Sequence, residues 1–354
     1  EVLGSNSNCD MFCAYYGIDK KGNTRPESDP HGELKGTNTL YIRNDLEDIA
    51  KKYSVSMEEC KRILEENRMK LKEHRRKRPK PHLDDKIITS WNGLMLSAFS
   101  KGYQVLHEPK YLQYAQKIAN FVKTEMYQDG KLLRSFRNGP SNILAFATDY
   151  AFMIRGLLDL YEASGDFQWL SWATELQEKQ HELFWDEDKG GYWNTTSKGK
   201  ILFQSKEIYD GAEPSENSVS FQNISRLAKM LSDDYWYQQG ERLMSAFHQY
   251  INKAPQICPE MAPHISSPVL PNKQIILAGD IQSQEVQDFI RIVHQNYDPY
   301  KVLLFVNKDS NDLLSPHLPH VQNIPLNTPA VYICQHQSCQ APIFSPEELK
   351  LALT

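Results

Sequence analysis

The chain lacks the features by which several large classes of protein are recognised. No apolar run approaches the roughly 20 residues of a membrane-spanning helix, so we predict no membrane partner. The formal net charge is −5 and the charges are well mixed, so we predict no nucleic-acid partner either. Gly-rich phosphate loops, serine nucleophile elbows and paired-His motifs are also missing. We therefore predict neither a cofactor nor a metal ion.

The N-terminus carries no targeting information. The chain starts at Glu1 without an initiator Met, and its first residues form neither a secretory signal nor a transit peptide. We expect the chain to begin inside a longer product, and both a cytoplasmic and a secreted location stay open. Six cysteines are dispersed over 354 residues. A chain of this length does not need disulfides to build a core, which favours reduced cysteines.

A repeated unit dominates what is present. Roughly every 60 residues the chain shows an acidic cluster, an almost wholly apolar helix, a one-sided amphipathic helix and, in the first two repeats, a Gly-containing hairpin. The clusters are Asp84-Asp85, then Asp149, then Asp210 with Glu213. Each cluster occupies the same point of the repeat, directly before or at the start of the apolar helix.

The apolar helices predict an inner layer. The helix expected at 148–164 is polar only along the stripe of Arg155, Asp159 and Glu162, so other helices must enclose it. The helix expected at 90–106 has the same character. The helices expected at 110–126 and 168–184 are apolar on one face only. This alternation is typical of an α/α toroid, in which the inner helices run parallel.

The character of the chain changes twice. Residues 1–81 are interpreted as a lead-in and the first helical pair of the toroid, with helices ending near Tyr53 and Lys77. Its basic end at 74–80 fits a helix C-terminus better than a nuclear address. Residues 82–264 would form the toroid hairpins. Residues 265–354 would form a small α/β unit with strands at 275–279, 302–306 and 330–334 and a helix at 283–296.

Parallel inner helices would gather the acidic clusters on one rim. Carboxylates across a concave rim suit acid/base chemistry on a glycosidic bond or a sugar carbon, and neighbouring aromatic rings suit stacking on sugars. The candidate catalytic residues are therefore Asp85, Asp149 and Asp210. The candidate substrate-binding residues are Asp84, Trp91, Asn92, Tyr150, Glu213 and Asn217.

These residues also have structural interpretations. Acids at helix N-termini act as caps and stabilise the helix dipole, so capping competes with catalysis at every cluster. Asn92 and Asn217 would either bind a ligand or tie neighbouring helices together. Near the C-terminus, Cys334, His336 and Cys339 have the spacing of a partial zinc site. No fourth ligand is near in sequence, so a strand end followed by a turn is favoured there.

Three parts of the chain, 84–95, 149–151 with 157–162, and 210–219, closely resemble the spermatogenesis-associated thioredoxin-like protein family. The lead-in at 12–17 and 29–36 and the tail at 332–343 are similar too, so the resemblance covers nearly the whole chain. It implies a six-hairpin glycosidase-like toroid, related to N-acylglucosamine and cellobiose 2-epimerases, and a role in male germ-cell development and fertility. The expected fold is mainly α, an incomplete (α/α)6 toroid of helical hairpins with a small C-terminal α/β appendage.

The chain departs from that family pattern. It lacks the thioredoxin-like domain and a redox Cys-x-x-Cys, so the resemblance does not imply thiol exchange. The earliest toroid hairpins are missing, and Glu216 stands where many relatives have Gly or Ala. The epimerases use inner-helix histidines, whereas His181 and His248 fall on helices expected to be outer. Shared fold is therefore weak support for shared chemistry.

Two hypotheses about function follow, and the sequence alone does not decide whether the chain is an enzyme. In the first, the toroid binds or acts on a sugar or glycan. In the second, it is a catalytically silent interaction module with no sugar substrate. Missing hairpins would expose inner helices along an edge of the ring, so we also expect self-association through an apolar seam.

Overall fold

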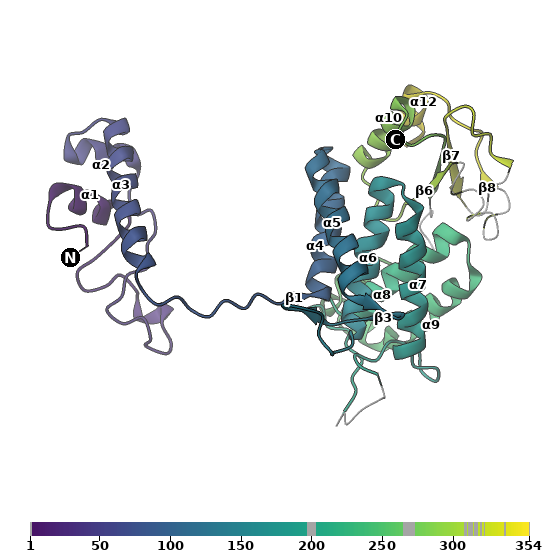
Figure 1. Ribbon diagram of the computed structural model, residues 1–354, viewed down its shortest axis with the longest axis horizontal. Helices are drawn as coiled ribbons and strands as arrows, with labels where there is room; N and C mark the ends of the chain where they lie inside the picture. Colours follow the sequence, from purple (N-terminus) through teal and green to yellow (C-terminus); the bar gives the residue numbers. More distant parts are fainter. Residues whose placement is uncertain are drawn as a thin grey trace. The chain divides into compact units, whose positions relative to one another are not determined.

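The computed structural model describes residues 2–196, 203–264, 273–307, 310, 314, 318, 321, 323–335 and 338–353. The chain divides into two compact units, residues 1–84 and residues 85–354 (Figure 1). None of the described helices is both long and apolar enough to cross a bilayer.

The first unit is a small helical cluster. It contains α1 (Ser7–Tyr15), the short 3-10 helix η1 (Pro26–Ser28), α2 (Leu46–Tyr53) and α3 (Met57–Arg76). The Ser56 side chain accepts the Glu59 N–H at 3.1 Å and so caps α3. The three α-helices share an apolar core: Met11, Phe12, Ile49, Ala50, Cys60, Ile63 and Leu64. Whether these helices belong to the toroid stays a prediction.

The second unit is built mainly from three helical hairpins. They are α4 (Thr89–Leu106) with α5 (Pro109–Glu125), α6 (Ala147–Ser164) with α7 (Phe167–Phe184), and α8 (Glu216–Leu231) with α9 (Asp234–Lys253). Helix α6 is buried along almost its whole length, whereas α5, α7 and α9 bury one face. The predicted inner and outer layers, and with them the incomplete α/α toroid, are confirmed.

The inner helices run parallel, with α6 between α4 and α8. Ser90 and Ser97 of α4 bond to Asp149 and Asp159 of α6, so both helices advance in the same direction. On the other side, Asn223 of α8 donates to a backbone carbonyl near the start of α6. Helices α4 and α6 approach closely at Gly93, where a Cβ would lie 2.5 Å from the backbone of Phe152. Only glycine fits this crossing.

Two short strand pairs lie next to the α4–α5 hairpin. Strand β1 (Ile87–Ile88) leads into α4 and pairs antiparallel with β4 (Ser135–Phe136). Strand β2 (Tyr127–Gln128) pairs antiparallel with β3 (Lys131–Leu132) through the turn predicted at Asp129-Gly130. After α9 the chain forms η2 (Pro255–Ile257) and η3 (Ala262–His264).

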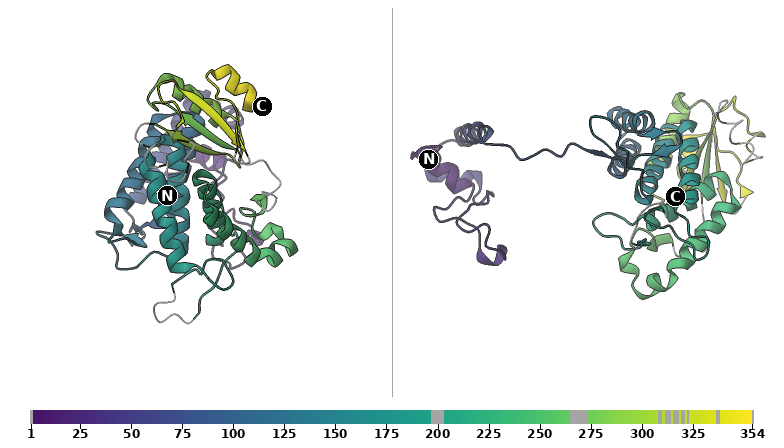
Figure 2. Two further views of the ribbon diagram at one scale, coloured as in Figure 1. Left: turned by 90° about the vertical axis from the view of Figure 1, so that its right-hand side faces the viewer. Right: turned by 60° about the horizontal axis from the view of Figure 1, so that its bottom comes forward.

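A four-stranded sheet lies at the C-terminal end of the inner helices (Figure 2). Its order is β6 (Val302–Val306), β5 (Gln274–Ala278), β7 (Ala330–Gln335) and β8 (Ser338–Cys339). As predicted, β5 and β6 are parallel and joined through α10 (Gln284–Gln295), while β7 is antiparallel to β5. The chain ends with α12 (Pro346–Leu353). The hydroxyl of Tyr161 in α6 accepts the Phe305 N–H at 3.0 Å, which fixes the sheet to this end of the toroid.

The two C-terminal cysteines correct one expectation. Strands β7 and β8 place Cys334 opposite Cys339, and the two sulfur atoms form a disulfide. The expectation of reduced cysteines is therefore wrong for this pair. The favoured strand end and turn is present, and bonded sulfurs are not available as zinc ligands. His336 lies outside the described residues.

Candidate functional site

The acidic clusters meet at one end of the second unit. Because α4, α6 and α8 are parallel, Asp85, Asp149 and Asp210 all lie at or just before helix N-termini at the end opposite the β5–β8 sheet (Figure 1). We call this end the rim. Asp84 is the last residue of the first unit and precedes Asp85 directly.

One contact joins the first and third helices across the rim. The indole Nε1 of Trp91, in the first turn of α4, donates to Glu213 Oε1 at 2.9 Å, just before α8. The Trp91 side chain nevertheless stays 55% exposed. An exposed aromatic ring fixed beside a carboxylate is a suitable surface for a sugar.

Asp149 occupies a structural position. Its side chain is fully buried and accepts three hydrogen bonds, from Arg134 at 2.7 Å, the Phe146 N–H at 2.8 Å and the Ser90 N–H at 2.9 Å. Burial raises the pKa of this carboxyl, while Arg134 and the two backbone donors oppose that rise. Asp149 thus ties the starts of α4 and α6 together.

Asp210 and Asp85 have different surroundings. Asp210 accepts the Ser215 N–H at 2.8 Å and the Glu260 N–H at 2.9 Å, so it joins the start of α8 to the segment after α9. Asp85 forms an ion pair with Arg137 at 2.6 Å, in which both side chains are about half exposed. Each predicted catalytic carboxylate therefore has a specific local partner.

Two of the predicted binding residues pack inside the protein. Tyr150 is 2% exposed and its ring lies against Phe184, so core packing replaces the expected stacking on a ligand. Asn217 is fully buried and exchanges two hydrogen bonds with the backbone of Tyr192, with a third to the carbonyl of Glu207. Of the two roles considered for Asn217, tying segments together is the one its contacts fit.

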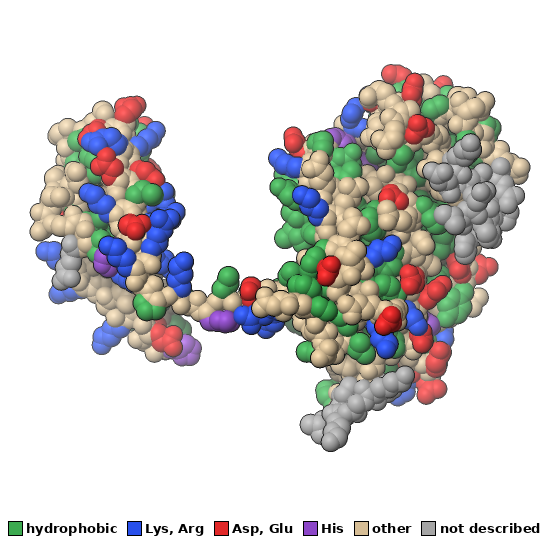
Figure 3. All heavy atoms as spheres, viewed as in Figure 1, with side chains coloured by type: hydrophobic (Ala, Val, Ile, Leu, Met, Phe, Trp, Pro, Cys, Tyr) green, Lys and Arg blue, Asp and Glu red, His purple; other side chains and the backbone are tan. Residues whose placement is uncertain are grey.

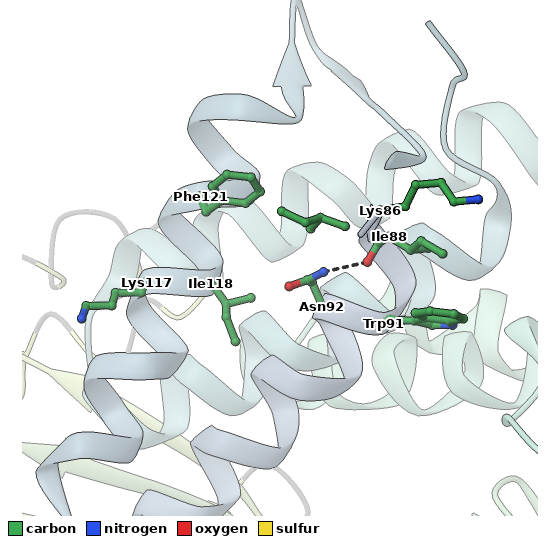
Figure 4. A pocket seen from close by; sticks show the side chains of 8 residues that line it. Lys86, Ile88, Trp91, Asn92, Lys117, Ile118 and Phe121 are labelled. Atoms are coloured by element: carbon green, nitrogen blue, oxygen red, sulfur yellow. Dashed lines mark hydrogen bonds between the residues drawn. The ribbon is translucent and has the colours of Figure 1, made fainter. Parts of the chain in front are cut away.

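Asn92 lines a shallow groove between α4 and α5. The groove encloses about 350 Å³, and Asn92 donates to the Ile88 carbonyl at 2.9 Å at its edge (Figure 4). Trp91 borders the same groove. The remaining lining residues come from β1, the residue before it and α5: Lys86, Ile87, Ile88, Lys117, Ile118 and Phe121.

Farther from the rim, a largely buried charged network that was not selected from the sequence lies between the inner helices. Arg226 of α8 pairs with Asp159 at 2.9 Å and with Glu162 at 3.0 Å, and Lys101 of α4 approaches Asp159 at 3.2 Å. Burial disfavours the charge on Asp159, but the two cations outweigh burial and lower its pKa to about 2. The Ser97 hydroxyl also donates to this carboxylate.

Nearer the rim, Arg155 pairs with Glu260 at 2.5 Å, and both side chains are about one quarter exposed. The sequence did contain a signal for these residues. Arg155, Asp159 and Glu162 form the one polar stripe on α6, and a polar stripe on an enclosed helix must face a polar interior. Among the described residues, no group of three or more His, Cys, Asp or Glu side chains is placed to hold a metal ion.

The two histidines considered from the sequence lie on the outer helices. His181 lies on α7 and His248 on α9, so the prediction that both belong to outer helices is confirmed. Burial lowers the pKa of His181 to about 4. The titratable residues that the sequence placed at the rim are carboxylic acids, and these two histidines are not among them.

Comparison with curated proteins found relatives over nearly the full chain. The human spermatogenesis-associated protein 20 is 36% identical over 357 aligned residues, covering 97% of this chain and 45% of that protein. The rat protein of the same name shows the same identity and coverage. An uncharacterized Caenorhabditis elegans protein is 31% identical, covering 98% of this chain and 49% of its own length. The chain thus spans about half the length of these relatives, and no family model matches it.

Solved structures show similarity in fold only. A cellobiose 2-epimerase from Bacillus thermoamylovorans aligns with a TM-score of 0.40 and 18% identity, covering 48% of this chain and 46% of that chain. A GH76 alpha-mannanase from Bacteroides thetaiotaomicron aligns with a TM-score of 0.39 and 15% identity, covering 47% and 46%. At these values the likeness carries no inference about chemistry.

Proposed function

We propose that this chain, a homologue of spermatogenesis-associated protein 20, binds a sugar or glycan at the rim between α4, α6 and α8. The observation that carries the proposal is the exposed Trp91 ring held beside Glu213. Sugar rings stack their C–H faces on aromatic side chains while their hydroxyls bond to carboxylates, and this pair offers both.

The Arg155–Glu260 pair supplies further polar contacts in this proposal. Arg155 belongs to the α6 stripe, and both side chains remain partly exposed, so they can exchange hydrogen bonds with hydroxyl groups. Asp85, Asp149 and Asp210 were predicted as catalytic, but their present contacts favour positioning the rim. If the chain catalyses a reaction on the bound sugar, we propose Glu213 and Glu260 as the accessible acid and base.

Titration calorimetry against a panel of monosaccharides and oligosaccharides tests the binding. We expect Trp91→Ala to weaken binding at least tenfold and Glu213→Gln to weaken it several-fold. Tyr297→Ala is the matched control, because this aromatic ring is 90% exposed and lies between α10 and β6. Equal heats for Trp91→Ala and the parent chain would exclude the Trp91 surface.

A second function is favoured by the contacts of the rim acids. All three predicted catalytic carboxylates form caps or ion pairs, as a silent interaction module would require. This alternative predicts no heat with any sugar and no conversion of any sugar in the panel. Calorimetry together with product analysis by chromatography therefore separates the two functions.

We also propose a role in male germ-cell development, for which the support is the relatives' name alone. Removing the gene product from an animal that carries it tests this role. Normal sperm counts and fertility after removal would contradict it. That result would leave sugar binding unaffected, because the two proposals have separate readouts.

A further inference from the structure

Two thiols of the first unit lie on the same face of one helix. Helix α1 carries Cys9 and Cys13, and both are free and half-buried. Residues four apart on a helix are neighbours, with about 5–6 Å between their Cβ atoms. The free thiols of Cys60 and Cys258 are fully buried in the apolar cores of the two units. Cys9 and Cys13 are therefore the two free thiols within reach of a small ligand.

The first unit itself holds the backbone of this pair in place. The Asn6 side chain accepts the Cys9 N–H at 2.9 Å and so caps α1. The Asn67 side chain of α3 donates to the Asn8 carbonyl at 2.9 Å, which fixes the start of α1 to α3. Between the two cysteines, Met11 is 1% exposed and packs into the core of this unit. The spacing of the two thiols is thus set within this unit, and the Met11 sulfur is not available as a third ligand.

The two thiols interact directly. The pKa of the Cys13 thiol is raised to about 11 by burial, by the charge of Cys9 and by a hydrogen bond with Cys9. That bond requires the two sulfur atoms to lie close together, so one ion can contact both. Two neighbouring thiolates repel each other, and a cation held between them removes the repulsion.

A pair of thiolates selects a soft metal ion with few ligands. Thiolates prefer soft ions such as Cu(I) to hard cations. A structural zinc ion takes four ligands, and among the residues that the structure describes no group of three or more His, Cys, Asp or Glu side chains is placed to hold a metal ion. In the view of Figure 3 the Asp and Glu side chains of the first unit are scattered among Lys and Arg side chains. Cu(I) fits this pair, because it accepts two thiolates in a nearly linear arrangement.

We propose that Cys9 and Cys13 bind one Cu(I) ion as its two thiolate ligands. Each thiol releases its proton as the sulfur binds, and the ion remains Cu(I), so no electrons are transferred. The complex carries one negative charge, and Cys9 lies in the first turn of α1, where the helix dipole favours such a charge. The site is separate from the proposed sugar site, because both ligands belong to the first unit.

Competition of the full chain with the Cu(I) chelator bicinchoninate, under anaerobic conditions with ascorbate, tests the site. We expect one tightly bound Cu(I) per chain. Cys9→Ser and Cys13→Ser should each weaken binding by at least about 100-fold, because losing a ligand costs more than losing an outer-shell partner. Cys334→Ser with Cys339→Ser is the matched control, since it removes the other closely spaced cysteine pair and should bind like the parent chain. Circular dichroism checks that every variant keeps its helices.

Cys13→Ser with Ala14→Cys separates the geometry of the pair from the number of thiols. It keeps the thiol count but moves one thiol to another face of α1, so we expect no tight site. Binding by this variant equal to that of the parent would overturn the proposal, and so would a parent chain that binds Cu(I) no more tightly than Cys9→Ser. X-ray absorption at the copper edge should show two sulfur ligands. A third ligand in that spectrum would exclude the two-thiolate site.

Discussion

The carboxylate of Asp149 in α6 accepts the backbone N–H of Ser90 in α4 at 2.9 Å, so one inner helix caps its neighbour. Ile88 precedes α4 and has no side chain able to cap it. The first N–H groups of a helix lack partners within the helix, and here a buried acid from another helix supplies one. The parallel packing of α4 and α6 depends on this contact.

Asp149→Asn should lower the free energy of unfolding by about 2–4 kcal/mol, because it removes the charge that pairs with Arg134 inside the protein. An amide NH₂ would also face a backbone N–H. Urea unfolding followed by circular dichroism measures the loss. Asp85→Asn makes the same chemical change in a half-exposed ion pair and should alter stability by less than about 1 kcal/mol. Equal losses in the two variants would show that Asp149 is not a structural tie.

Gly93→Ala should destabilise the second unit strongly. The new Cβ would lie 2.5 Å from the Phe152 backbone, and a backbone cannot move aside as a side chain can. Overpacking of this kind costs about 1–3 kcal/mol or more. Gly102→Ala is the control, because its Cβ would meet the Tyr111 ring at an ordinary 3.6 Å. That variant should gain up to about 1 kcal/mol from helix propensity. Thermal unfolding of both variants distinguishes the two effects, and similar melting temperatures would contradict the close crossing.

The layers of the toroid could be predicted from the sequence because a helix that other helices surround is apolar on almost every side. Helix α6 has three polar stripe residues, and the structure buries it among α4, α7 and α8. The parallel pairing of β5 and β6 could also be predicted from the sequence, because two short apolar runs on either side of a helix are typical of a crossover connection. Local periodicity is sufficient for these predictions, because each depends on one element and its own faces.

The site was harder to predict because side-chain roles depend on contacts distant in sequence. Asp149 resembled a catalytic acid, yet its partners Ser90 and Arg134 come from other elements. The partner of Trp91 is 122 residues away, and no periodicity links the two. Arg155 was visible as part of a polar stripe, but its pairing with Glu260 required the fold.

Asp159→Asn should lower the free energy of unfolding by about 3–5 kcal/mol, because among the described residues it leaves the buried Arg226 with Glu162 as its one remaining acidic partner. The parent chain should also be acid-sensitive, because Asp159 has its pKa lowered from 3.8 to about 2. The stabilisation by an acid with a depressed folded-state pKa is complete above pH 3.8 and is lost as pH falls toward 2. Asp288→Asn, in a surface pair with Arg291, should change stability little. Denaturant unfolding at pH 7 and pH 3 tests this. If Asp159→Asn loses as much stability between these two pH values as the parent chain does, the prediction is wrong.

Glu216 should make the protein less stable as pH rises from about 4.5 to about 7. The carboxyl lies in the first turn of α8, is 5% exposed and accepts backbone hydrogen bonds from its own N–H and, at 3.3 Å, from the Glu207 N–H. Burial raises its pKa from 4.5 to about 7, so the folded chain retains a proton that the unfolded chain releases. Stability therefore falls between about pH 4.5 and pH 7 and then levels off, with an upper bound of about 3 kcal/mol.

Glu216→Gln keeps the shape of the side chain and removes the ionisation. It should leave stability at pH 5 nearly unchanged and raise it by about 1–3 kcal/mol at pH 8, where the parent chain must bury a charge. Glu241→Gln, on the exposed face of α9, is the matched control and should follow the parent curve. Urea unfolding of the three chains from pH 4.5 to pH 8 gives the comparison. If the parent and Glu216→Gln curves run parallel over that range, the Glu216 carboxyl is already ionised in the folded protein. Some donor must then reach it from the segment at Glu207.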